Sequence, residues 1–199
     1  MVLNTNHAIF LIEVLGVLAI PGPTNSLLFV SGVTRGLRLS LPLVLATVVA
    51  YSLSISLLLF ALKPASQVHA AVGPLLRVLC SLYLVHLAVW LWRAGAQEVQ
   101  DSHPITIRRV FLTTLMNPKT LIFALGIFPA AGAGANELLT SLTWFAAVCT
   151  AVACGWIAGG AFLHSTGAHK THLNWLYRGE AFLLAGFAIV ILVSAYYSS

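Results

Sequence analysis

Charged side chains are scarce in this chain, and acidic ones are the scarcest. Only 8% of its 199 residues are charged, with ten basic and five acidic residues, whereas 59% are hydrophobic. A soluble domain carries about 25% charged residues, so this composition excludes an ordinary soluble protein. It predicts an all-α polytopic membrane protein. In so charge-poor a chain, the basic excess reports membrane orientation and does not indicate nucleic-acid binding.

The sequence also lacks the motifs of several functional classes. It has no phosphate-binding loop, no dinucleotide fingerprint and, within its apolar runs, no Ser/His/Asp or His-Glu constellation. Cys80, Cys149 and Cys154 all lie in apolar runs, which favours packed thiols over a disulfide framework. We therefore expect no enzymatic activity, no cofactor and no nucleic-acid partner.

Long hydrophobic runs are what the chain has in abundance. On a window of about 20 residues, apolar runs cover about 8–33, 39–62, 72–92, 109–131, 138–163 and 176–197. Their connections are short, so we expect a single transmembrane domain over 1–199 with six transmembrane helices. The longest polar connection, about 93–109, divides it into two halves of three spans, about 1–95 and 105–199.

The fourth run carries a lysine at the depth where a membrane helix tolerates it least. Lys119 has about ten residues of the run on either side, about 15 Å of helix, which places it near the middle of a hydrocarbon core about 30 Å thick. An ammonium group there costs about 2.5–3.5 kcal/mol. Pro118 lacks an N–H and deprives the Thr114 carbonyl of its helical donor. This combination indicates the wall of a polar cavity, and the alternative is a kinked helix whose Lys119 snorkels to an interface.

The residues around this break predict how the chain continues. Asparagine is a favoured N-cap and proline a favoured first helical residue, so Asn117-Pro118 predicts a second half-helix from Pro118 onward. The amides of Lys119, Thr120 and Leu121 would then be free and would carry the positive end of the helix dipole. Together with the Lys119 ammonium group, they favour an anion such as a substrate carboxylate.

The first run contains a second break, Pro21-Gly22-Pro23, followed by the polar residues Thr24 and Asn25. The two prolines remove two amide donors and free the carbonyls of Val17 and Ala19. The first span of each half is therefore broken near its middle by a proline motif. With three spans per half, the halves lie in opposite orientations. Such an inverted repeat, with corresponding interrupted helices, indicates the binding site of a secondary transporter.

Basic residues predict the orientation in the membrane. The connections after the first, third and fifth spans hold seven of them: Arg35, Arg38, Arg93, Arg108, Arg109, Lys170 and Arg178. The opposite connections hold two, Lys63 and Arg77. Because basic residues accumulate on the cytoplasmic side, the odd-numbered connections are expected there and both termini outside.

The two proline motifs carry a resemblance to a known family. With Pro21-Gly22-Pro23 in the first span and Asn117-Pro118-Lys119 in the fourth, the sequence resembles the LysE/RhtB translocators, which export amino acids such as lysine, arginine, homoserine and threonine. The resemblance covers nearly the whole chain. It implies a multi-pass protein of the bacterial inner membrane that exports an amino acid using the proton gradient. The implied partners are the amino acid, protons and the lipid bilayer, with a homodimer left open.

Two residues within the spans are candidates for proton coupling. Glu13 lies in the first span at a depth similar to that of Arg77, so the alternatives are an ion pair, two separately snorkelling side chains, or a coupling carboxylate. His86 in the third span is either a proton relay or a hydrogen-bonded packing residue.

His164, His169 and His172 form a cluster of side chains that can bind zinc or nickel. Its basic neighbours favour a solvated loop, and we expect no metal site.

The alternatives to amino-acid export are a metal-cation exporter, for which carboxylates are too few, and a non-transporting membrane assembly factor. The predicted substrate-binding residues are Pro21, Gly22, Pro23, Thr24, Asn25, Asn117, Pro118 and Lys119.

Overall fold

A computed structural model describes most of the chain. It covers residues 5–68, 105–128 and 134–166, together with individual helical residues within 75–92 and 182–193. Across these residues the secondary structure is helical: α1 (Thr5–Ala19), α2 (Pro23–Ser40), α3 (Pro42–Val68), α5 (Ile107–Leu115), α6 (Lys119–Ile122), the π-helix η2 (Phe123–Ile127) and α7 (Ala135–Thr166). The expected runs 72–92 and 176–197 lie for the most part outside the described residues.

Four of the predicted spans coincide with these helices. Among the described residues, Pro42–Ala61 of α3 and Ala135–Phe162 of α7 are each long and apolar enough to cross a membrane. The other two spans are bent pairs, α1 with α2 at 63° and α5 with α6 and η2 at 46°. Both bends fall at the proline motifs, which confirms the two predicted breaks.

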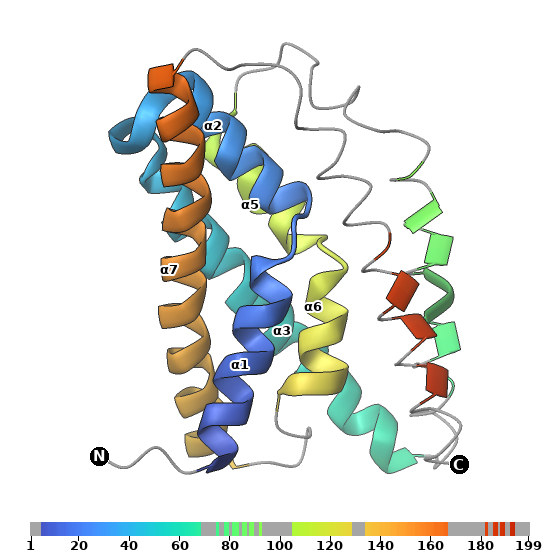
Figure 1. The fold of residues 1–199 in the computed structure, drawn as a ribbon. Helices are drawn as coiled ribbons and strands as arrows, with labels where there is room; N and C mark the ends of the chain where they lie inside the picture. Colours follow the sequence, from blue (N-terminus) through green and yellow to red (C-terminus); the bar gives the residue numbers. More distant parts are fainter. Residues whose placement is uncertain are drawn as a thin grey trace.

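The described helices run as an inverted repeat requires. In Figure 1 the pair α1–α2 climbs from the lower end of the molecule to the upper end, whereas α5–α6 descends from the upper end to the lower. The helices that follow them, α3 and α7, also run in opposite directions (Figure 1). The two broken pairs lie against each other, so their breaks meet in the interior of the bundle.

The closest helix contact joins α2 to α7 through two glycines. A β-carbon added at Gly32 would lie 2.2 Å from the Ile157 carbonyl oxygen, and one added at Gly160 would lie 2.0 Å from the Phe29 carbonyl oxygen. Only glycine therefore lets the two backbones approach this far, which is a common way to pack helices in a membrane. Because α2 carries Thr24 and Asn25, this contact fixes one wall of the bundle interior.

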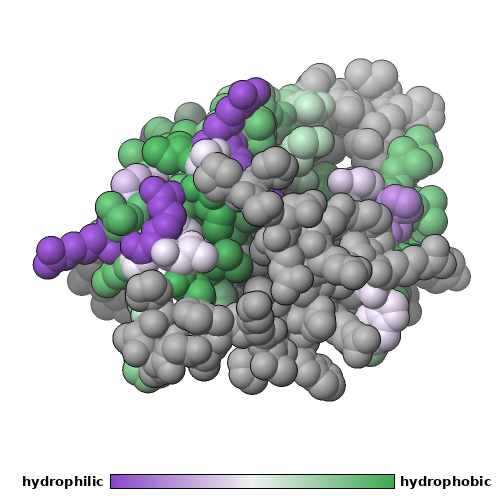
Figure 2. All heavy atoms as spheres, turned by 90° about the horizontal axis from the view of Figure 1, so that it is seen from above, coloured by the Kyte–Doolittle hydropathy of each residue, from purple (hydrophilic) through white to green (hydrophobic). Residues whose placement is uncertain are grey.

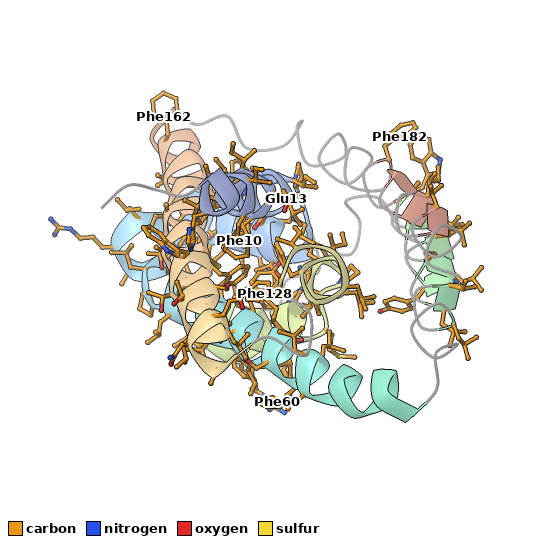
Figure 3. All side chains as sticks on the ribbon, turned by 90° about the horizontal axis from the view of Figure 1, so that it is seen from below. Phe10, Glu13, Phe60, Phe128, Phe162 and Phe182 are labelled. Carbon is orange, nitrogen blue, oxygen red and sulfur yellow. The ribbon has the colours of Figure 1, made fainter. Side chains whose placement is uncertain are left out.

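The outside of the bundle is strongly apolar. Large hydrophobic side chains such as Ile12, Leu45, Phe60 and Phe162 are more than half exposed. Figure 3 shows Phe60 and Phe162 at the periphery and Phe10 and Phe128 inside the ring of helices. An apolar exterior of this extent suits a lipid environment and would be a liability in water.

The end of α2 and the beginning of α5, both at the upper end of the molecule in Figure 1, carry arginines. Near the C-terminal end of α2 the chain bends sharply at Gly36, whose φ of 75° is one that side-chain-bearing residues rarely adopt. Arg35 beside it donates to the Ile105 carbonyl at 2.8 Å, which joins the α2 end to the start of the second half. Figure 2, which looks down on this end, shows hydrophilic side chains among hydrophobic ones. Arg38, Arg108 and Arg109 lie on these same segments, at the end predicted to be cytoplasmic.

Candidate functional site

The two proline breaks meet in a buried group of polar side chains. This central polar cluster consists of Thr24, Asn25, Ser54, Thr114, Asn117, Lys119 and Thr120, all of them buried. The Asn117 amide Nδ2 donates to Thr24 Oγ1 at 2.9 Å, and the hydroxyls of Thr24 and Thr114 lie 3.1 Å apart. Residues about ninety positions apart in the sequence thus contact each other directly, and the cluster joins the two halves of the chain.

At the first break, a side chain takes the place of the missing helical donors. Helix α1 ends at Ala19, and Asn25 Nδ2 donates to the carbonyls of Leu18 at 2.8 Å and Ile20 at 2.7 Å. Gly22 is extended, with φ −171° and ψ 169°, before α2 begins at Pro23. Asn25 therefore caps the C-terminal end of α1 from within the next helix, which matters because no bulk water reaches this depth.

At the second break, the structure differs from the expectation of free amides. Helix α6 begins at Lys119, one residue later than predicted. The Lys119 amide donates to Asn117 Oδ1 at 3.0 Å, and the amides of Thr120 and Leu121 donate to the carbonyls of Asn117 and Pro118, both at 3.0 Å. The prediction of free amides is wrong for this conformation, because a tight turn with i to i+3 bonds satisfies them locally.

The Thr114 carbonyl, which Pro118 was expected to deprive of its donor, is also satisfied, and so is the carbonyl that follows it. The Thr114 carbonyl accepts from the Asn117 amide at 3.0 Å, three residues along the chain. The Leu115 carbonyl accepts from Ser54 Oγ at 2.8 Å, which comes from α3. A hydroxyl from another helix thus closes the gap that the proline leaves, as buried backbone groups require.

Lys119 is buried and its ammonium group is held within the cluster. Its side chain is 1% exposed, and Nζ donates to the Ile20 carbonyl across the repeat interface. Ile20 follows the last residue of α1, so the ammonium group lies against the negative end of that half-helix dipole. This position excludes the alternative in which Lys119 snorkels to a membrane interface. It also shows how the fold accommodates a cation at this depth.

Three members of the cluster are not among the predicted substrate-binding residues: Ser54, Thr114 and Thr120. The Thr120 hydroxyl is buried and has no hydrogen-bond partner among the described residues. The only feature of the sequence that could have identified Thr120 as a site residue is its position directly after Asn117-Pro118-Lys119. Ser54 is one serine among several in α3, and nothing in its spacing distinguishes it. A buried hydroxyl without a partner is costly, so a ligand that bonds to it gains affinity.

The coupling candidates lie apart from the cluster. Glu13 lines an open pocket with a volume of about 580 Å³ at the opposite end of the molecule from the arginines, together with His7 and Glu137. His86 is exposed, and no described contact joins it to the central polar cluster. Arg77, His169, His172 and the side chain of His164 lie outside the described residues. Over the part of the chain that is described, no three His, Cys, Asp or Glu residues group as metal ligands.

Comparison with known protein families gives a match over most of the chain. The family model described as LysE type translocator matches residues 15–195, which is nearly the whole chain. No match was found among curated proteins, and none among solved structures. The chain therefore belongs to the LysE type translocator family and is a multi-pass membrane protein that moves a small-molecule substrate across the lipid bilayer.

Proposed function

We propose that this translocator exports an amino acid from the cytoplasm of a bacterium across its inner membrane, as a secondary transporter driven by the proton gradient. The observation that carries the proposal is the buried Lys119 ammonium group, held at the crossing of two interrupted helices. Corresponding breaks of this kind surround the substrate in transporters built from inverted repeats. An ammonium group among hydroxyls and an amide suits the carboxylate and the amino group of a zwitterion.

Lys119 binds the substrate carboxylate in this proposal. In the described conformation its Nζ donates to the Ile20 carbonyl, which is a neutral acceptor. A carboxylate is a stronger acceptor for an ammonium group than a carbonyl, so an entering substrate can replace Ile20 as the partner. The Thr120 hydroxyl, which lacks a partner among the described residues, supplies a further bond. Asn25 still satisfies the Ile20 carbonyl when Lys119 leaves it.

The remaining site residues shape the position in which the substrate binds. Pro21, Gly22 and Pro23 produce the break that exposes the Ile20 carbonyl, and Pro118 produces the opposite one. Asn117 and Thr24 hold the two breaks together through a bond of 2.9 Å, and Asn25 holds the first break through its bond of 2.7 Å to the Ile20 carbonyl. Rocking of one broken pair against the other exposes the cluster first to the cytoplasm and then to the outside. Glu13 takes up the coupling proton from the pocket that it lines with His7 and Glu137, which is called the outer pocket because the predicted orientation places that end outside.

A metal-cation exporter fits this cluster less well. The described members of the cluster are hydroxyl, amide and ammonium groups, and the carboxylates Glu13 and Glu137 lie in the outer pocket instead. Hard cations bind where several carboxylate and carbonyl oxygens converge. The Lys119 ammonium group would repel them, so the chemistry of the cluster favours a zwitterion.

Efflux from proteoliposomes tests the proposal. Vesicles containing the purified protein are loaded separately with radiolabelled lysine, threonine and homoserine, and efflux is measured under an imposed proton gradient. Lys119→Met retains the bulk of the side chain and removes its charge. We expect export to fall to the rate of loaded vesicles that contain no protein. Replacing a buried charge by an apolar residue of similar size is often neutral for stability, so the variant should remain folded.

Lys63→Met is the matched control, because it makes the same chemical change at another lysine, near the C-terminal end of α3. It should export at the wild-type rate. We also expect Lys119→Arg to restore little activity, since a planar guanidinium does not fit a site built for a point charge. Wild-type export by a well-folded Lys119→Met protein would show that Lys119 does not bind the substrate.

A further inference from the structure

A series of aromatic rings connects the central polar cluster to the outer pocket. Tyr51 from α3 contacts Phe123 from η2 with ring centroids 5.9 Å apart, and Phe123 contacts Phe145 from α7 at 5.0 Å. Phe145 contacts Phe128 at 5.7 Å, and Phe128 contacts Phe10 from α1 at 5.5 Å. All of these contacts are edge-to-face. The two broken pairs, α3 and α7 each contribute a ring.

The two ends of this aromatic stack lie at the two sites already described. At its inner end, the Phe123 amide donates to the Lys119 carbonyl, so Phe123 follows Lys119 by one helical turn. At its outer end, Phe10 lines the pocket of about 580 Å³ with Ile127, Trp144, Glu13 and Glu137. Figure 3, which looks at the molecule from this end, shows Phe10 and Phe128 side by side in the middle of the bundle.

The stack fills the space between the cluster and the pocket. Tyr51, Phe123, Phe128 and Phe145 are all buried, and they belong to one apolar core with Val14, Leu18 and Ile122. Protein interiors of this kind are close-packed and leave no passage for a polar molecule. An amino acid held at Lys119 therefore cannot reach the outer pocket unless these rings move apart.

The chain around two of the rings has an unusual conformation. Phe123 begins the π-helix η2, and the Phe128 amide closes it by donating to the Phe123 carbonyl at 2.8 Å. At Phe128 the backbone becomes extended, with φ −70° and ψ 150°. Single π-helical turns are rare and occur often at functional sites, because a shift of one residue returns them to α-helix. Such a shift rotates the residues that follow, so η2 can move Phe128 relative to Phe145.

We propose that Phe10, Phe123, Phe128 and Phe145 form the closed outer gate of this protein, and that η2 is the element that opens it. The gate separates the central polar cluster from the outer pocket in the described conformation. It opens when Phe128 leaves its contacts with Phe10 and Phe145. That the passing molecule is an amino acid rests on the proposed function, whereas the barrier itself does not.

Thiol labelling tests the gate without any transport measurement. Cys80, Cys149 and Cys154 are replaced by serine. Thr120→Cys, which exchanges a hydroxyl for a thiol and removes one methyl group at a 2% exposed position, reports access to the cluster. A charged, membrane-impermeant thiol reagent is added from outside to sealed cells, and from the cytoplasmic side to inverted vesicles. We expect Phe145→Ala and Phe128→Ala to raise the outside labelling rate by about tenfold or more, because each ring makes at least two edge-to-face contacts in the stack.

Phe162→Ala is the matched control, because Phe162 lies on the same helix as Phe145 and is 69% exposed. It should leave the labelling rate unchanged. Phe128→Leu retains most of the apolar volume and removes the ring. It serves as the test variant if the alanine variants fail to fold, and it should also accelerate labelling from outside.

Two results would overturn the proposal. One is an outside labelling rate that the folded gate variants do not change. The other is equal acceleration from both sides of the membrane, which would mean that the bundle has loosened generally. If no amino acid is exported in the efflux assay but labelling responds as expected, the gate stands and the proposed substrate does not.

Discussion

The contact between α2 and α7 makes a strong prediction for Gly160→Ala. A β-carbon at this position would lie 2.0 Å from the Phe29 carbonyl oxygen and 3.0 Å from the Val33 amide nitrogen. Ordinary contacts between such atoms are about 3.5 Å, so the two helices must separate by roughly 1 Å or more. Both neighbours are backbone atoms, which cannot avoid the clash by a change of rotamer.

The cost follows from two opposing effects. Overpacking a tight site costs about 1–3 kcal/mol, and a clash with backbone belongs at the upper end of that range. Alanine is a better helix former than glycine by about 1 kcal/mol, which offsets part of the loss. We therefore expect a net destabilisation of about 2 kcal/mol. For a chain of this length, that corresponds to an unfolding temperature about 4–8 °C lower.

Thermal unfolding of the purified protein in detergent measures this shift. Gly155→Ala is the matched control, since Gly155 lies on the same helix and a β-carbon there meets no atom within 4 Å. It should raise the unfolding temperature by about 2–4 °C through helix propensity alone. An unchanged or higher unfolding temperature for Gly160→Ala would show that α2 and α7 do not approach as closely as described.

Two further predictions concern coupling and orientation. Glu13→Gln should remain folded, because Glu13 is exposed in the outer pocket, but its efflux should no longer respond to an imposed pH gradient; a full response in proteoliposomes would remove Glu13 from the coupling. A cysteine placed at Gln97, in an otherwise cysteine-free protein, should react with an impermeant reagent in inverted vesicles and not in intact cells. Labelling from outside intact cells would show that the predicted orientation is wrong.

Composition and the positions of the prolines were enough to predict the class of protein and the places where its helices break. A composition with 8% charged residues is compatible with lipid and not with a soluble core. Proline lacks an amide hydrogen, so Pro21, Pro23 and Pro118 each deprive an earlier carbonyl of its helical donor, and the helices break at these motifs. The order of the breaks, one in each half, predicted the opposite courses that α1–α2 and α5–α6 follow in the structure.

The side chains that satisfy the backbone at these breaks become known only from the packing of the helices. Lys119 Nζ bonds to the Ile20 carbonyl and Ser54 Oγ to the Leu115 carbonyl, partners that lie 99 and 61 residues apart in the sequence. The aromatic stack likewise joins residues from α1, α3, η2 and α7. No local pattern encodes such pairs, because a proline shows that a carbonyl has lost its donor and does not show which distant side chain replaces it. That choice depends on where the helices cross, and the crossing is set by contacts such as Gly32 and Gly160, whose meaning appears only when both helices are in place.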